Sequence, residues 1–259
     1  MLLFLLLTVF FAFINPYVPY DGDDWSILTW FRNAIPTWHA WNPTRVLPEI
    51  LMPIAGYIAA FFVYPVCGDY VFSLTLITAV IVSALIIWYV VLVQLNMKKF
   101  FQLSHRTAWL LGLLFLLFHF IVFSHKDTPI PFLFNVENFT CVYFYLIPAL
   151  LNSIVVLLIL NTFYNIECGR MIADFFSRAN YELLFLAVYL AIFSNLFQNI
   201  ILISFVSVIL LLQSPWQKGF RTRNLISYIL LPCRINRCQY MATGRMCGIG
   251  CMWKIIAGH

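Results

Sequence analysis

Apolar residues fall into six long runs along the chain, and short polar segments separate them. The runs are Leu2–Ile14, Leu47–Val66, Tyr70–Leu95, Thr107–Phe123, Cys141–Leu160 and Leu183–Leu212. A helix needs about 20 apolar residues to cross the hydrocarbon core of a membrane, and the runs at 70–95, 107–123 and 141–160 fit that length directly. The pattern predicts an all-α fold, a polytopic bundle of transmembrane helices.

Two of the runs leave their path through the membrane open. Leu47–Val66 contains three prolines, and proline breaks a helix interior unless neighbouring groups satisfy the freed backbone. It can span the membrane, or lie at the interface as a re-entrant or juxtamembrane helix. Leu183–Leu212 is 30 residues long, and polar residues from Ser194 to Asn199 interrupt it. It can form one tilted helix, or a hairpin of two short helices that turns near Asn195–Asn199.

Composition leads to the same class of fold. Apolar residues make up 63% of the 259 residues, charged residues make up 10%, and the mean hydropathy is +0.91. A soluble domain carries about 25% charged residues, so the lipid bilayer is an expected partner.

The sequence has no glycine-rich phosphate loop, no Gly-x-Ser-x-Gly elbow and no His-Glu-x-x-His motif. We therefore expect no cofactor and no metal.

Basic residues indicate which side of the membrane each loop faces. They concentrate in three places, the loops at 96–106 and 161–181 and the segment after Leu212. Lys and Arg are enriched in cytoplasmic loops, so the run at 70–95 enters from the outside, and a hairpin at 183–212 keeps the basic tail inside. If 47–66 does not span, the loop at 20–46 faces outside; if it spans, that loop is cytoplasmic.

The last part of the chain, residues 214–259, differs from the apolar region at 1–213. From residue 183 onward there are seven Lys or Arg and no acid, which suits an anionic membrane surface better than a nucleic acid. The pairs Cys233/Cys238 and Cys247/Cys251 resemble a crude zinc pattern. We prefer the alternative to a zinc site, in which these cysteines are free thiols in a poorly ordered tail. The tail shows neither helical period nor strand alternation, as a truncated or shifted reading frame would produce.

The segment after the first run contains the most informative chemistry. Asp21, Asp23 and Asp24 lie within four positions, and Trp25, Trp30, Trp38 and Trp41 follow them. An interfacial aromatic belt explains the tryptophans but not three carboxylates that repel one another. Acids at a membrane boundary are more often ion ligands or catalytic groups. In a close carboxylate pair one member can act as a general base, aromatic rings suit sugars, and Arg32 and Arg45 can bind a phosphate.

This arrangement resembles the GT-C glycosyltransferases, membrane enzymes that use polyprenyl-linked sugars. The resemblance rests on a first helix, an outer loop with Asp23-Asp24-Trp25, and Trp38-x-x-Trp41 followed by Arg45. It implies that Asp23 or Asp24 is the catalytic acid/base, with Asp21 as a possible substitute. It also implies that 47–66 is a juxtamembrane helix and that Lys98–Lys99 is the cytoplasmic end of the next span. We thus expect five to six spanning helices in a bacterial inner membrane, with the first large loop periplasmic.

The same resemblance implies the substrates and further contacts. The donor would be a polyprenyl-phosphate-linked sugar, and the acceptor a cell-envelope glycan or lipid, as in O-antigen glucosyltransferases. Asp21, Trp25, Trp38, Trp41 and Arg45 would bind substrate. In the second outer loop, Lys126 would meet the lipid phosphate, and Asp127 or Glu137 the acceptor; a solvated loop with ordinary charges is the alternative. Family members usually carry further helices and a soluble domain, so we expect an incomplete enzyme.

Two other functions stay open. A transporter or channel would use polar residues in a broken helix, and 194–199 is the one such interruption in the runs. A non-catalytic remnant would only insert its helices. We interpret His119, inside an apolar run, as a core histidine bonded to a nearby carbonyl. Asn138-Phe139-Thr140 matches the N-glycosylation acceptor pattern, which often occurs by chance.

Overall fold

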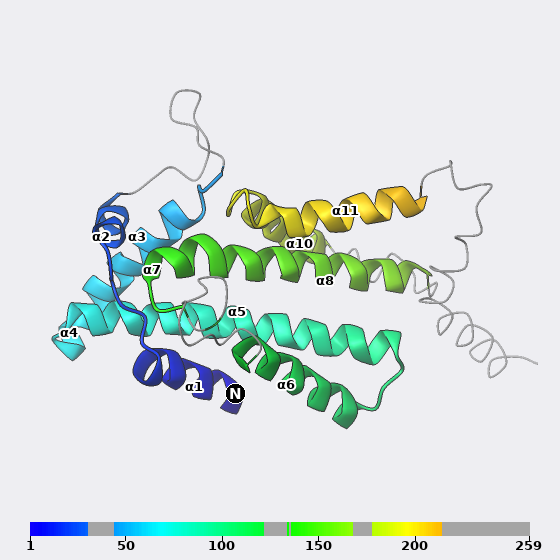
Figure 1. The fold of residues 1–259 in the computed structure, drawn as a ribbon, viewed down its shortest axis with the longest axis horizontal. Helices are drawn as coiled ribbons and strands as arrows, with labels where there is room; N and C mark the ends of the chain where they lie inside the picture. Colours follow the sequence, from blue (N-terminus) through cyan, green and yellow to red (C-terminus); the bar gives the residue numbers. More distant parts are fainter. Residues whose placement is uncertain (31–43, 122–133, 135, 168–177, 214–259) are drawn as a thin grey trace, which may run out of the picture.

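A computed structural model describes residues 1–30, 44–121, 134, 136–167 and 178–213 (Figure 1). Helices dominate this part of the chain, and the pairing of Val18 with Asn138 is an isolated bridge rather than a strand. The predicted all-α fold is confirmed for these residues. The helices are α1 (Leu2–Val9), α2 (Gly22–Thr29), α3 (Pro48–Ile58), α4 (Tyr64–Cys67), α5 (Tyr70–Phe100), α6 (His105–Ile121), α7 (Phe139–Cys141), α8 (Ile147–Glu167), α10 (Arg178–Ile192) and α11 (Asn199–Gln213).

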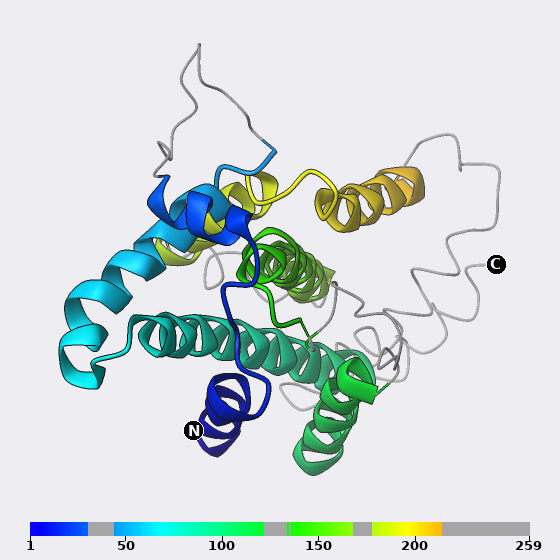
Figure 2. The same ribbon diagram turned by 60° about the vertical axis from the view of Figure 1, so that its left-hand side comes forward.

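Two long helices form the centre of the bundle. α5 packs along α8, α1 and α6 lie against α5, and α10 and α11 lie against α8 (Figures 1 and 2). Fully buried apolar side chains such as Leu74, Ile86 and Ile154 fill the space between them. At 1.5 Å per residue the 31 residues of α5 extend over about 46 Å. Its two ends therefore lie farther apart than the thickness of a membrane's hydrocarbon core, about 30 Å.

Three of the described helical segments are long and apolar enough to cross a membrane. They are Pro48–Cys67, Tyr70–Phe100 and Phe139–Thr162. Leu2–Ile14, His105–Ile121 and Asn199–Leu211 are apolar but shorter. The run at 107–123, which we expected to span on length alone, thus belongs to the shorter group, because its described helix ends at Ile121.

The run at 47–66 forms one continuous helical segment despite its prolines. It runs obliquely across the end of the bundle at which α5 begins (Figure 2). Met52, Ala55 and Ala59 face the protein and are fully buried, whereas Phe61 and Phe62 are exposed. Length and composition permit this segment to span, and its oblique position is equally typical of a helix that lies at the membrane interface.

π-helical turns precede two of the prolines that lie within apolar helices. The turns η2 (Ala59–Val63) and η3 (Val142–Leu146) each end two residues before a proline, Pro65 or Pro148. A third turn, η1 (Phe10–Ile14), ends the first helix before Pro16, and Pro53 lies inside α3 without such a turn. A proline ring clashes with the carbonyl four residues earlier in a regular α-helix. The wider turn relieves that clash and is a recognised cause of helix bending.

The last apolar run is divided as the two-helix alternative predicted. α10 ends at Ile192 and α11 begins at Asn199. The turn between them is fastened to the segment before α3, because the Leu47 N–H donates to the Phe193 carbonyl at 3.0 Å and the Leu196 N–H to the Thr44 carbonyl at 3.2 Å. Residues far apart in the sequence thus meet at one end of the bundle.

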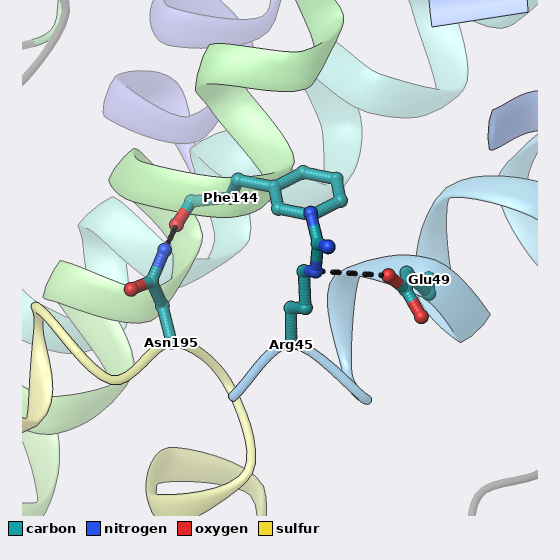
Figure 3. Close-up of polar contacts among 4 residues, drawn as sticks. All are labelled: Arg45, Glu49, Phe144 and Asn195. Carbon is teal, nitrogen blue, oxygen red and sulfur yellow. Dashed lines mark hydrogen bonds and ion pairs between the residues drawn. The ribbon is translucent and has the colours of Figure 1, made fainter. Parts of the chain in front are cut away.

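Asn195 fastens the same turn to η3 (Figure 3). Its Nδ2 donates to the Phe144 carbonyl at 2.6 Å, and Asn195 is 6% exposed. In an α-helix that carbonyl would accept from the residue four positions later, which is Pro148 and has no N–H. The amide of Asn195 therefore supplies the donor that proline removes, and a buried carbonyl is satisfied across two helices.

Replacing Asn195 by Leu should lower the free energy of unfolding by about 1–3 kcal/mol, because the Phe144 carbonyl would be buried without a donor. Adding Pro148→Ala restores an N–H at the position that an α-helix uses. The double variant should therefore recover most of the loss. Thermal unfolding in detergent of the parent, both single variants and the double variant measures this coupling. If Asn195→Leu lowers the free energy of unfolding equally in the parent and in the Pro148→Ala variant, the explanation is wrong.

Candidate functional site

The acidic cluster lies at the end of the bundle where α2 crosses α3. Asp21 is the N-cap of α2, and Asp21 and Asp24 form a capping box around its first turn. This follows from local sequence, because an acidic N-cap residue and an acceptor three residues later satisfy the free N–H groups of a helix start. Asp23 and Asp24 also lie in the first turn, where the helix dipole stabilises negative charge.

Asp24 is completely buried and its carboxylate accepts four hydrogen bonds. Oδ2 accepts from the N–H of Tyr20 at 2.7 Å and of Asp21 at 3.3 Å. Oδ1 accepts from the Thr140 N–H at 2.7 Å and from the Thr140 hydroxyl. An ionised carboxylate has acceptor sites for all four donors, and hydrogen bonds to a charged group are roughly twice as strong as neutral ones. Asp24 therefore ties the loop after α1 to the start of α7.

Further contacts fasten the two segments together. Asn138 Nδ2 donates to Asp21 Oδ2 at 3.2 Å, and Asn138 Oδ1 accepts from the Cys141 N–H as the N-cap of α7. The Val18 N–H donates to the Glu137 carbonyl at 2.9 Å. The residues of the glycosylation pattern at 138–140 are thus used for hydrogen bonds within the site.

Tyr17 forms an apolar support just before the cluster. Its ring is fully buried and stacks on Phe11 with 5.1 Å between centroids, and its carbonyl accepts from the Thr75 hydroxyl at 2.5 Å. Burial, and then the neighbouring Tyr143, raise the pKa of Tyr17 well above its usual value. A phenol is neutral at physiological pH even at its usual pKa, so Tyr17 adds no charge next to the carboxylates.

Asp23 differs from Asp24 in its exposure and in its hydrogen-bond partners. It is exposed, and its carboxylate has no partner among the residues that the structure describes. Trp25, also exposed, follows it on α2. Of the two residues predicted as the catalytic base, only Asp23 is open to a substrate. Asp21 and Glu137, predicted to bind substrate, are exposed at the same end of the molecule.

Arg45 lies beside the turn that joins α10 to α11 (Figure 3). Its Nε pairs with Glu49 Oε1 at 3.3 Å; the Arg45 side chain is 53% exposed and that of Glu49 2% exposed. The ion pair uses Nε, and about half of the Arg45 side chain stays exposed to solvent. Sequence reasoning missed Glu49, although its position four residues after Arg45 at a helix start was a usable signal.

Several predicted site residues fall outside the described part of the chain. They are Arg32, Trp38, Trp41, Lys126 and Asp127, and the cysteines of the tail. Their predicted roles stay predictions. His119, by contrast, behaves as expected for a core histidine: its Nδ1 is 2.8 Å from the Phe115 carbonyl and its ring stacks on Phe134.

No protein-family model, curated protein or solved structure matches this chain. The site must therefore be interpreted from its own geometry. Within the described residues, no three His, Cys, Asp or Glu side chains are grouped so that they could hold a metal ion. What the geometry offers is the exposed carboxylate of Asp23, beside the exposed Asp21 and Glu137, with an arginine and exposed aromatic rings at the same end of the bundle.

Asp24→Asn should destabilise the protein much more than Asp23→Asn. The new NH₂ group would face backbone N–H groups, and each buried donor left unpaired costs about 1–3 kcal/mol. Asp23 is exposed, so its change should stay within about 0.5 kcal/mol. Thermal unfolding of the purified variants in detergent provides the comparison, and equal shifts for the two would show that Asp24 is not an anchor.

Proposed function

We propose that the chain is a multi-pass membrane protein with the acidic cluster on the non-cytoplasmic side. Lys98, Lys99 and Arg106 lie where α5 ends and α6 begins, at the opposite end of the bundle from the cluster (Figure 1). Basic residues favour the cytoplasmic side. Helices α1, α5, α6, α8, α10 and α11 then cross the membrane, and the first large loop is periplasmic in a bacterial inner membrane.

In this topology the segment α3–η2–α4 is a juxtamembrane helix at the outer interface. Exposed aromatic side chains gather on it and on α2: Trp25, Trp30, Tyr57 and Tyr64. Trp and Tyr are enriched at membrane–water interfaces. An interfacial helix that follows the acidic loop and precedes a span with a basic end is the arrangement that the resemblance to the GT-C enzymes implies.

We propose that the activity is transfer of a sugar from a polyprenyl-phosphate donor to a cell-envelope glycan or lipid. The observation that carries this proposal is the exposed Asp23 carboxylate, held by a buried anchor on the loop that follows the first helix. Asp23 removes the proton of an acceptor hydroxyl. At the same time the oxygen of that hydroxyl forms a bond to the anomeric carbon of the donor sugar. The bond from that carbon to the phosphate oxygen breaks, and the electron pair leaves with the polyprenyl phosphate. Arg45 or Lys126 stabilises its charge, and the configuration inverts.

The geometry gives a transporter less support. Such a protein would need polar groups in the broken helix that are available to a solute. Here Ser194 Oγ donates to the Ala191 carbonyl at 2.6 Å, and Asn199 Nδ2 donates to the Ile192 carbonyl at 2.7 Å. These side chains satisfy backbone carbonyls in the turn between α10 and α11. The polar residues in this apolar run therefore have a structural role and need no solute to bind.

The proposed topology predicts opposite labelling of two positions in a chain whose native cysteines are replaced by serine. A cysteine at position 23 should react with a membrane-impermeant maleimide in intact cells. One at position 106 should react only after the membrane is opened, because Arg106 is at the basic end. The opposite pattern would place the carboxylates in the cytoplasm, and the enzyme proposal would then fail.

Asp23→Asn should reduce sugar transfer about 10²- to 10⁴-fold, the usual contribution of a general base. The assay follows radiolabelled sugar from a polyprenyl-phosphate-linked donor into envelope material in membranes that contain the chain. Asp69→Asn is the matched control, since Asp69 is an acid at the same end that caps α5, and Asn caps equally well. Transfer by the parent with no effect of Asp23→Asn would refute the base assignment, and no transfer by the parent would refute the activity.

A further inference from the structure

The second outer segment reaches the acidic cluster through Asn138 and Thr140. Thr140 places two donors, its backbone N–H and its hydroxyl, on the same oxygen of Asp24. The other carboxylate oxygen is held by the N–H groups of Tyr20 and Asp21, from the segment that leads into α2. Asp24 is thus fixed from both sides, and only the Thr140 side belongs to a distant part of the chain.

This contact sets the rotation of α2 about its own axis. Successive side chains on an α-helix point about 100° apart. When Asp24 faces α7, Asp23 is therefore turned away from it, and the structure has Asp24 buried and Asp23 exposed. Leu28, four residues after Asp24 and therefore on the same face of α2, packs close to Gly56 of α3, where an added Cβ would lie 3.2 Å from Leu28 Cδ2. The same face of α2 is thus oriented by apolar packing of Leu28 on α3 and by the directional hydrogen bonds between Asp24 and Thr140.

We propose that Thr140 is the positioning residue of the site, which directs Asp23 outward by fixing Asp24. Its catalytic meaning rests on the proposed function, whereas the orientation of α2 does not. The hydroxyl is required as well as the backbone: valine would keep the N–H but lose the second donor, and serine would keep both. The Asn-x-Thr pattern at 138–140 then has a use that involves no glycosylation.

Cysteine labelling measures this orientation without any substrate. In the chain without native cysteines, cysteines are placed singly at position 23, which is exposed, and at position 28, where Leu28 is 8% exposed. The ratio of their labelling rates should be high in the parent and unchanged, within about twofold, in Thr140→Ser. In Thr140→Val the ratio should fall about tenfold, as expected for loss of one hydrogen bond to a charged group.

Thr78→Val is the control for general destabilisation. Thr78 is fully buried and its hydroxyl lies 3.0 Å from the Tyr143 hydroxyl inside the bundle. This variant should lower thermal stability without changing the labelling ratio. The proposal is overturned if Thr140→Val leaves the ratio unchanged, if Thr140→Ser lowers it equally, or if Thr78→Val lowers it as much as Thr140→Val.

Sugar transfer provides a second and separable result. If the proposed function holds, Thr140→Val should lower kcat with little change in KM, and Thr140→Ser should restore it. If the labelling ratio falls in Thr140→Val while no variant and no parent transfers sugar, Thr140 positions α2 and the glycosyltransferase proposal is wrong. If the ratio stays constant while transfer depends on Asp23, the enzyme proposal stands and the positioning role is refuted.

Discussion

A carboxylate that has no contact with water must find its hydrogen-bond donors within the protein. Asp24 finds four of them in two short segments, residues 20–21 and residue 140. Because these segments precede α2 and begin α7, the hydrogen bonds link the start of α2 to the segment that leads into α8. Asp23, next to this buried group on α2, has its carboxylate on the exposed face of the helix.

The sequence predicted the helices well and the site only in part. Hydrophobic runs located α5 and α8, and the polar residues after Ser194 located the break before α11. The spacing of Asp21 and Asp24 is that of a capping box, a local signal that separates Asp24 from Asp23 and was not used. The other half of the Asp24 anchor is Thr140, 116 positions later. Pairing between distant segments leaves no periodic signal in a single sequence, so the contact with Thr140 could not be predicted.

The prolines show a similar limit. Proline predicts a helix end, because it lacks an N–H and clashes with the preceding turn. In apolar surroundings a helix end is costly, since every freed carbonyl must be satisfied by protein. The chain widens one turn before Pro65 and before Pro148 and continues as helix. The Asn195 side chain donates the hydrogen bond that the Phe144 carbonyl lacks because of Pro148. From the sequence alone, Asn195 was recognised only as part of the polar break in an apolar run.

Among the described residues, several polar contacts between distant segments lie at the acidic end of the bundle. Residues 18–24 bond to residues 137–140, and residues 44–47 bond to the turn at 193–196. Along the helices, apolar side chains dominate the contacts. Lipid is as apolar as those side chains, so it gives little preference for one helix arrangement over another. Directional hydrogen bonds between distant segments therefore specify how the loops are arranged at the end of the bundle where the carboxylate of Asp23 and the guanidinium of Arg45 lie.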